Sequence, residues 1–291
     1  INEWPLRPSY GGRAKGKMGE KGLQTPAKKL LLWVRKQSKK VKTALGFGTS
    51  LTLLLTLRLL IHDHNHFFVL AELVHFIGLL CLIYKLSTLK TCSGLSLKTQ
   101  VLTAIFLAVR VFCSFIMEGD VHTVLDFVTF VATLWVIYMM KFKLKSSYMA
   151  DLDTMHSWYL IVPCAIVAFF IHPITAHPFF FRVLWAFCVY LESISVLPQL
   201  RMMQNVQIIE PFTAHYVFAL GVARFLGCAH WINQVYDTRG AYLILAGRGY
   251  FWIPMVFLSE IVQTFILADF CYYYIKSVIS GQLLVRLPQP V

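Results

Sequence analysis

The sequence predicts an all-α, polytopic membrane protein, and three observations support this fold class. Hydrophobic residues make up 57% of the 291 positions. Only 14% of the residues are charged, whereas about a quarter are charged in an average soluble domain. Apolar stretches of roughly 20 residues recur along the chain, and this is the length that an α-helix needs to cross a bilayer. A helix satisfies its own backbone hydrogen bonds where lipid offers no partners.

The first part of the chain is strongly basic. Residues 1–42 contain 12 Lys or Arg and 2 Asp or Glu, and they therefore supply +10 of the net charge of +13. We expect a largely disordered cytosolic arm that lies near anionic lipid, with a short basic amphipathic helix over residues 29–42. A nucleic-acid partner is not predicted, because no folded basic module follows the arm.

The apolar runs predict the transmembrane helices. A run at 43–61 is barely long enough to cross the membrane and predicts one additional span. Seven clearer spans follow, at 67–86, 97–117, 121–140, 157–172, 179–197, 212–235 and 251–277.

The charges between the spans predict the orientation. Lys residues occur in segments 85–98 and 141–153, whereas Lys and Arg are absent from the intervening loops at 62–66, 118–122 and 172–178. Cytosolic loops carry the excess of Lys and Arg. Eight spans therefore place both termini in the cytosol, and the loop at 236–250, with two arginines, is an exception.

A weak internal repeat relates the two halves of the chain. GLSLKTQ at 94–100 opens one predicted helix, and LPQL at 197–200 ends another. In both segments a helix-breaking Gly or Pro stands near a polar amide. Membrane proteins built by such duplication often hold their binding site between the halves, near the middle of the bilayer.

Three of the charged residues within apolar spans point to a site. They are Arg110, Arg224 and Glu192, the last within the segment WAFCVYLESISVLPQL at 185–200. A charge in hydrocarbon is costly, so these residues predict a polar cavity inside the helical bundle. Two arginines with one glutamate leave positive charge uncompensated, and the ligand expected is therefore an anionic group such as a carboxylate. Structural pairing or snorkelling of the arginines is the alternative.

Three more residues are candidates for the same cavity. Glu72 lies one helical turn from His75 on the same face. If His75 faces Glu192, it would gain a proton as the pH falls from neutral toward about 6. Trp185 is either a wall of the cavity or part of an interfacial aromatic belt.

Catalysis, cofactors and metals are not predicted. The seven cysteines form no CxxC pair and are typical of small buried hydrophobic residues. A short loop carries His62, His64 and His66, and we expect it to be solvated rather than a metal site. The chain has no P-loop, no H-E-x-x-H and no pattern of nucleophile and base, so a function other than an enzyme is expected.

Five long segments resemble the ER lumen protein-retaining receptor, or KDEL receptor, family. They are KTCSGLSLKTQ (90–100), WVIYMMKFK (135–143), WAFCVYLESISVLPQL (185–200), FTAHYVFALGVAR (212–224) and ILADFCYYYIKSV (266–278). The resemblance covers about 66–288, and the extra N-terminal segment is similar to a plant subgroup of receptor-like proteins. It implies a seven-helix bundle like that of SWEET and PQ-loop proteins, with two three-helix bundles joined by a linker helix.

The resemblance also implies a function. Receptors of this family reside in Golgi and ER membranes, where they bind C-terminal signals of escaped ER luminal proteins and return these proteins to the ER. It implies that Arg110 engages the peptide, that Trp185 and Arg224 line the cavity, and that His75 and Glu192 belong to a pH-sensing cluster.

The sequence departs from the family at several of the implied site positions. Ala223 stands where the family has a tyrosine that links the histidine and the glutamate. Other replacements fall at Phe68, Cys113, Arg182, His230 and Gln234. These departures predict a signal different from the standard Lys-Asp-Glu-Leu tetrapeptide.

Two other functions are compatible with the sequence. A small-solute transporter of the SWEET/PQ-loop type is the alternative, since Pro198-Gln199 and the GLS motif suit alternating access. A scaffold whose basic arm binds membrane lipids or vesicle coat proteins is a third possibility. The predicted partners are thus C-terminal peptides of ER luminal proteins, lipids and coat proteins.

Overall fold

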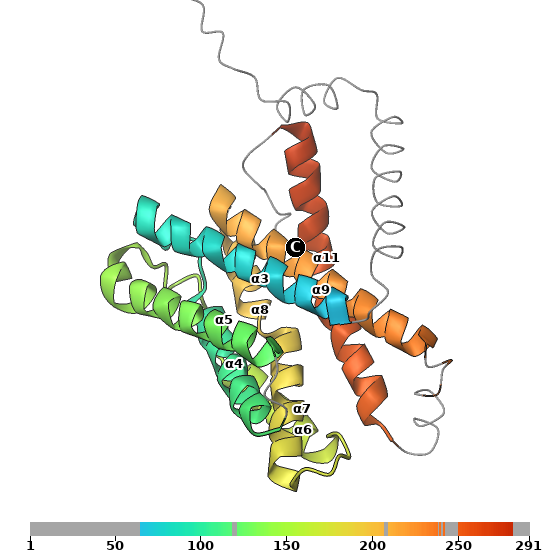
Figure 1. Ribbon diagram of the computed structural model, residues 1–291. Coiled ribbons are helices and arrows are strands. Elements are labelled where there is room, and N and C mark those ends of the chain that lie inside the picture. Colours follow the sequence, from blue (N-terminus) through green and yellow to red (C-terminus); the bar gives the residue numbers. More distant parts are fainter. Residues whose placement is uncertain are drawn as a thin grey trace, which may run out of the picture. The chain divides into compact units, whose positions relative to one another are not determined.

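The computed structural model describes residues 65–117, 121–206, 209–237, 239, 241 and 250–281. The described residues belong to the second of the two units into which the chain divides, Thr52–Val291. In this part of the chain every regular element is a helix (Figure 1). The predicted arm at 1–42 and the predicted additional span at 43–61 lie outside the described residues.

The main helices follow the predicted spans closely. In chain order they are α3 (Asn65–Tyr84), α4 (Leu97–Met117), α5 (Val121–Tyr138), α6 (Trp158–Phe170), α7 (Phe179–Ile194), α8 (Leu197–Asn205), α9 (Pro211–Asp237) and α11 (Trp252–Ser280). Single π-helical turns extend α3 over Lys85–Leu89 and α5 over Met139–Lys143, and a 3₁₀ turn follows at Lys145–Ser147.

Most of these helices are long enough to cross a membrane. By length and composition six helical segments of the described chain qualify, and α7 and α8 count together as one of them. The apolar helix α6 has only 13 residues and contains Pro163. At 1.5 Å per residue it is roughly 20 Å long, less than the hydrocarbon thickness of about 30 Å. The predicted all-α polytopic fold is confirmed.

The helix that carries Glu192 ends earlier than predicted. We expected it to end at Pro198-Gln199, but α7 ends at Ile194 and a new helix, α8, begins at Leu197. Pro198 lies in the first turn of α8, where its missing N–H needs no partner. The hydroxyl of Ser195 donates to the carbonyl of Glu192, which gives the last turn of α7 a local partner.

The start of α4 is held by polar contacts with two other segments. Ser96 precedes the helix, and its Oγ accepts the backbone N–H of Thr99, as an N-cap does. The same hydroxyl donates to Asp153, whose carboxylate also accepts the N–H of Lys98 and the hydroxyl of Tyr148. Burial, together with the bond to Asp153, raises the pKa of Tyr148. The Asp153 carboxylate lies at the N-terminus of α4, where the helix dipole favours negative charge.

The two segments of the predicted repeat contact each other directly. Gln199 is fully buried, and its Oε1 accepts the N–H of Ser96 at 2.8 Å. Its Nε2 donates to the carbonyl of Gly94, and its backbone N–H donates to Thr99, both at 2.8 Å. Gly94 has φ +76°, a conformation that favours glycine and aims its carbonyl at the amide. The start of α8 is thus clamped to the start of α4.

Helix contacts repeat in a two-fold pattern. When α3, α4 and α5 are matched in order to α7, α9 and α11, each of the main contacts among these six helices has a counterpart. The contact of α3 with α9 corresponds to that of α7 with α4, and α4–α5 corresponds to α9–α11. The contact of α3 with α5 likewise corresponds to that of α7 with α11. Figure 1 shows α3 and α9 side by side, and α6 packs against α7. This pattern agrees with two three-helix sets joined by a linker helix.

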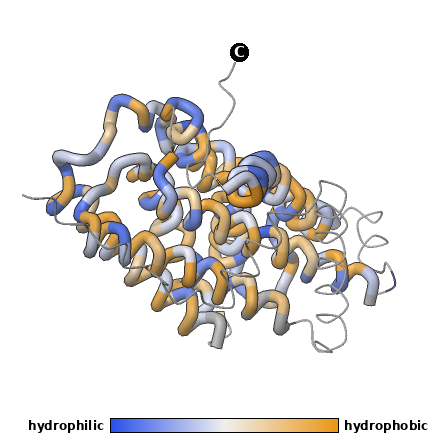
Figure 2. Tube along the Cα trace, turned by 90° about the horizontal axis from the view of Figure 1, so that it is seen from above, coloured by the Kyte–Doolittle hydropathy of each residue, from blue (hydrophilic) through white to orange (hydrophobic). Residues whose placement is uncertain are grey.

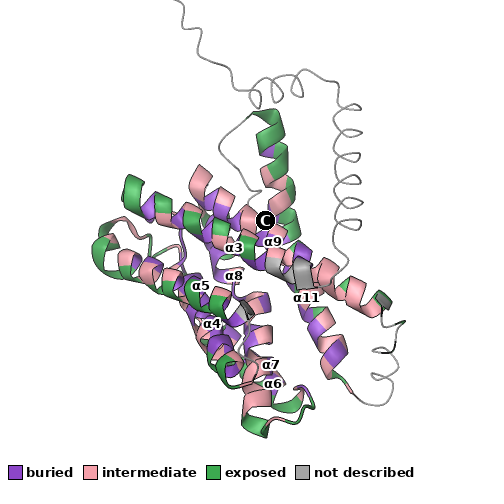
Figure 3. Cartoon of the chain, in the orientation of Figure 1, coloured by how far each residue is buried: buried purple, intermediate pink, exposed green. Residues whose placement is uncertain are grey.

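The apolar residues divide between the interior and the outer surface. Buried clusters form around Leu82 and Val217, and around Phe106 and Leu191. Hydrophobic residues prevail along the helices (Figure 2), and much of the helix surface is exposed (Figure 3). Many large hydrophobic side chains are among the exposed ones, and Phe265 is 74% exposed. Exposed apolar side chains of this size are expected where a helix faces lipid.

Candidate ligand-binding site

Arg110 is the centre of a buried ion-pair cluster. It lies on α4 and only 6% of its surface is exposed. Its Nε donates to Asp126 Oδ2 at 2.8 Å, and its Nη2 donates to Asp126 Oδ1. Its Nη1 donates to Glu192 at 2.8 Å, and its Nη2 reaches Glu72 at 3.3 Å. The guanidinium therefore joins carboxylates from three other helices, α3, α5 and α7.

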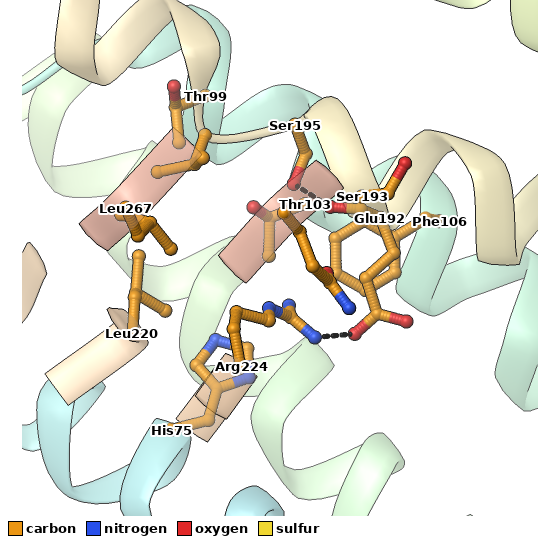
Figure 4. Close-up of a pocket in the computed structure, with 12 residues that line it drawn as sticks. His75, Thr99, Thr103, Phe106, Glu192, Ser193, Ser195, Leu220, Arg224 and Leu267 are labelled. Carbon is orange, nitrogen blue, oxygen red and sulfur yellow. Dashed lines mark hydrogen bonds and ion pairs between the residues drawn. The ribbon is translucent and has the colours of Figure 1, made fainter. Parts of the chain in front are cut away.

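Glu192 connects the two arginines of the cluster. Its Oε2 accepts from Arg110, and its Oε1 accepts from Arg224 Nη1 at 2.5 Å (Figure 4). Glu192 lies in α7 and Arg224 in α9, so the chain of ion pairs crosses the bundle from α5 to α9. Figure 4 shows His75 beside Arg224, on the same side of the cavity. Charges inside a membrane bundle are stabilised in this way by opposite charges.

The predicted balance of charge is wrong. We expected two arginines with a single glutamate, but Arg110 alone pairs with Glu72, Asp126 and Glu192. These three carboxylates outnumber the two guanidinium groups. Asp126 was not among the predicted site residues. It lies in an apolar span, and the sequence does not show that it is a neighbour of Arg110, which lies on another helix.

Two small cavities adjoin the ion pairs. The larger, of about 50 Å³, is lined by Glu72, His75, Arg110, Glu192 and Arg224, and by residues of α9 and α11. The smaller, of about 10 Å³, is shown in Figure 4 and includes His75, Glu192 and Arg224 among its lining residues. A water molecule needs at least about 10 Å³ of such space, so the larger cavity has room for a few waters or one small group.

The structure brings together most of the predicted site residues. Glu72, His75, Arg110, Glu192 and Arg224 all line the larger cavity. Trp185 does not line either of the two cavities, and it packs against the apolar cluster of α4, α6 and α7. Its role in ligand binding stays a prediction, as do the roles of the other five.

The positions that depart from the family have different surroundings. Ala223 and His230 line the larger cavity, and Ala223 presents a methyl group there where the resemblance implies a tyrosine side chain. Cys113 is fully buried. Arg182 lies with its guanidinium 5.9 Å from the centre of the Phe179 ring. The side chain of Phe68 lies outside the described residues.

Three charged residues that matter here were not predicted as site residues. Asp126 pairs with Arg110, and Glu260 of α11 lines the larger cavity. Lys85 was assigned to a basic loop, but it is fully buried, with its Nζ 2.6 Å from Glu210. The acidic residues within apolar spans were a signal that could have identified Asp126 and Glu260. Nothing local indicated that Lys85 would be neutralised by Glu210, which is 125 positions away.

The fold and the site together define a class of protein. The described chain is a bundle of apolar helices that encloses an ion-pair cluster and small polar cavities. Buried charges of this kind mark a functional site in a polytopic membrane protein. The arrangement suits binding of a charged ligand group.

Comparison with known proteins gives the family. A family model described as ER lumen protein retaining receptor matches residues 91–234. The ER lumen protein-retaining receptor erd-2.2 of Caenorhabditis elegans is 35% identical over 226 residues, 77% of this chain and 99% of that protein. Receptor B of Arabidopsis thaliana is 34% identical, over 73% of this chain and 94% of its own length. Receptor 3 of Mus musculus is 33% identical, over 78% of this chain and 100% of its own length.

The chain belongs to the ER lumen protein-retaining receptor family. The resemblance seen in the sequence is thereby confirmed. The described helices α3 to α11 fall within the predicted receptor-like region, 66–288, apart from the first residue of α3. The exact limits of that region stay a prediction.

Proposed function

We propose that this protein is a receptor of ER and Golgi membranes that binds C-terminal retrieval signals of ER luminal proteins and returns these proteins to the ER. Its relatives are named as receptors that retain ER luminal proteins. The observation that carries the proposal is Arg110, a buried arginine whose guanidinium borders a polar cavity. The names of these relatives favour a receptor over a small-solute transporter.

Binding requires a rearrangement of the ion pairs. Every nitrogen of the Arg110 guanidinium already donates to a carboxylate. A cavity of about 50 Å³ is also far smaller than the pockets of about 300 Å³ or more that enclose organic ligands. The guanidinium has five N–H groups and makes four hydrogen bonds to internal carboxylates. A peptide carboxylate therefore binds it with two hydrogen bonds only by displacing an internal carboxylate, and helices must separate to admit the peptide. The described arrangement is accordingly the closed form of the receptor.

Protonation of His75 is the proposed link between binding and pH. His75 faces Glu72 of α3, Arg110 of α4, Glu192 of α7, and Arg224 and His230 of α9, all around one cavity that Glu260 of α11 completes. A proton on His75 adds positive charge among these carboxylates, and it weakens their hold on the arginines. The arginines then become more available to an anionic ligand in the more acidic compartment. With Ala223 in place of tyrosine, this coupling would act through space rather than through a hydroxyl.

Location and partners complete the proposal. Both termini face the cytosol, and the basic arm at 1–42 contacts anionic lipid. Vesicle coat proteins would bind the cytosolic face. These statements rest on the charge pattern of the sequence.

Peptide binding by the purified, full-length protein tests the proposal. We expect selective capture from a library of C-terminal tetrapeptides, with more capture at about pH 5.5 than at about pH 7.4. Arg110→Lys keeps the positive charge but loses the planar fork of donors, and it should weaken binding at least about tenfold in calorimetry. Arg201→Lys changes an exposed arginine of α8 and is the control. Failure to capture any peptide at either pH would overturn the proposal.

A further inference from the structure

A basic loop follows α5. The π-helical turn Met139–Lys143 ends that helix, and the 3₁₀ turn Lys145–Ser147 comes next. Lys141, Lys143 and Lys145 are all exposed along these turns. None of the ion pairs found in the described part of the chain involves these three lysines. Their ammonium groups are therefore available to an external partner.

A second loop adds a fourth lysine to this surface. The backbone N–H of Cys92 donates to Ser147 Oγ at 3.0 Å, so the loop that follows α3 is joined to the loop that follows α5. Lys90 lies two residues before Cys92 and is exposed. It ends the π-helical turn of α3 in a left-handed backbone conformation, with φ +51°. Tertiary structure thus brings together lysines from two stretches of sequence that lie about 50 residues apart.

The loop after α5 is anchored on its inner side. Leu144 packs against a buried hydrophobic cluster, and its N–H donates to the carbonyl of Met139 at 2.8 Å. Tyr148 packs against the same cluster, and its hydroxyl donates to Asp153 at 2.7 Å. These contacts fix the backbone on both sides of Lys145. The lysines are consequently presented by an ordered loop, which lowers the entropy lost when they bind a partner.

The charge of this surface is positive. Asp153 is only 2% exposed, and its carboxylate already accepts hydrogen bonds from Ser96 and Tyr148. Asp151 is exposed in the same segment and offsets one positive charge. Four lysines and one aspartate leave a formal charge of +3 at neutral pH. A surface of this charge at the end of apolar helices attracts anionic groups.

Two exposed aromatic rings adjoin the lysines. Phe142 is 66% exposed, and its ring centre lies 5.6 Å from that of Tyr138, which is also exposed. The Nζ of Lys141 lies 5.8 Å from the centre of the Phe142 ring. Aromatic rings and lysines at the end of an apolar span are typical of the level of the lipid headgroups. A membrane surface therefore fits these residues better than a water-soluble partner does.

We propose that Lys90, Lys141, Phe142, Lys143 and Lys145 form a docking surface for phospholipids with an anionic headgroup. The ammonium groups donate to the phosphate and carboxylate oxygens of the headgroups, and Phe142 lies at the boundary with the acyl chains. The proposal rests on the proposed function only for the choice of leaflet, because it takes this surface to face the cytosol. It requires neither the ion-pair cluster nor a bound peptide.

Lipid titrations of the purified, full-length protein, followed by native mass spectrometry, test the proposal. Phosphatidylserine should bind at least about tenfold more tightly than phosphatidylcholine. Lys141→Gln, Lys143→Gln and Lys145→Gln should each weaken the binding of phosphatidylserine about fivefold, which is the effect of one lysine near an anionic membrane surface. Arg201→Gln removes an exposed charge of α8 outside this surface and should have little effect. Binding to the arm at 1–42 is common to all these variants, so their comparison isolates the loop.

A variant of Phe142 distinguishes a membrane lipid from a soluble anion. Phe142→Ala should weaken the binding of phosphatidylserine and leave the binding of glycerophosphoserine, its soluble headgroup, unchanged. If glycerophosphoserine binds the unchanged protein as tightly as the lipid does, the surface takes a soluble anion and the lipid docking is overturned. Equal affinities for the two lipids would also overturn it, as would equal losses in Arg201→Gln and the lysine variants.

Peptide capture by the same variants separates this proposal from the proposed function. Lys143→Gln should capture C-terminal peptides as the unchanged protein does, because no residue of these loops lines the larger cavity. A preference for phosphatidylserine without capture of any peptide would retain the lipid surface and overturn the receptor. Capture of peptides without a preference for phosphatidylserine would retain the receptor and overturn the lipid surface.

Discussion

At the scale of the residue, the partner of Arg110 decides what the site can bind. The bidentate contact of Asp126 occupies the Nε–Nη2 edge of the guanidinium, an edge whose paired donors suit a carboxylate. The apolar residues around Arg110 in the sequence showed that burying its charge is costly. They did not show which residue pairs with it. The consequence is a competition between an internal carboxylate and that of the peptide.

Asp126→Asn should therefore strengthen peptide binding. The amide keeps one acceptor for Arg110 but loses the negative charge, so a peptide carboxylate displaces it more easily. We expect an affinity about tenfold higher by calorimetry for peptides with a free C-terminal carboxylate. C-terminally amidated peptides are the control and should show no gain. An equal gain for amidated peptides would contradict the competition.

At the scale of the element, the clamp between α8 and α4 holds the two halves together. Gln199 connects Gly94, Ser96 and Thr99 through three hydrogen bonds of 2.8 Å. The two segments were recognised in the sequence as a repeat. Their direct contact was not predicted, since similarity between segments does not say that they touch.

Gln199→Ala should destabilise the protein. It removes two of the three bonds and leaves the N–H of Ser96 and the carbonyl of Gly94 without these partners. We expect a loss of about 2–4 kcal/mol in the free energy of unfolding, measured by denaturant unfolding in detergent. Gln204→Ala changes an exposed glutamine of the same helix and should cost little. Equal losses in the two variants would refute the clamp.

At the scale of the whole molecule, the orientation depends on the run at 43–61. Eight spans place both termini in the cytosol, whereas seven spans place the basic arm in the lumen, against the positive-inside rule. The burial of Lys85 with Glu210 removes one of the charges used in that argument. Lys90 remains exposed, and the arm itself supplies +10.

Engineered glycosylation sites should report this orientation. An acceptor introduced into the arm or at the C-terminus should remain unmodified in microsomes, because we propose that both face the cytosol. An acceptor in the loop at 172–178 should be glycosylated and is the positive control. Modification of the arm would mean that 43–61 does not span the membrane, and it would reverse this part of the proposal.

Sequence alone determined the helical membrane fold, the approximate spans and the family. The hydropathy of a span depends only on consecutive residues of the sequence. For this reason α4 was predicted at its observed bounds, Leu97–Met117. It also identified Arg110, Glu192 and Arg224 as residues that need a polar cavity.

Only the tertiary structure decided which charges meet. Arg110 and Glu192 are 82 positions apart, and their contact depends on the faces that α4 and α7 turn toward each other. The positions of Asp126 on α5 and Glu260 on α11 also became known only from the structure. Their carboxylates change the expected net charge of the site from positive to negative. The charge balance of a site depends on which residues are neighbours in space, and the order of residues along the chain does not show which residues these are.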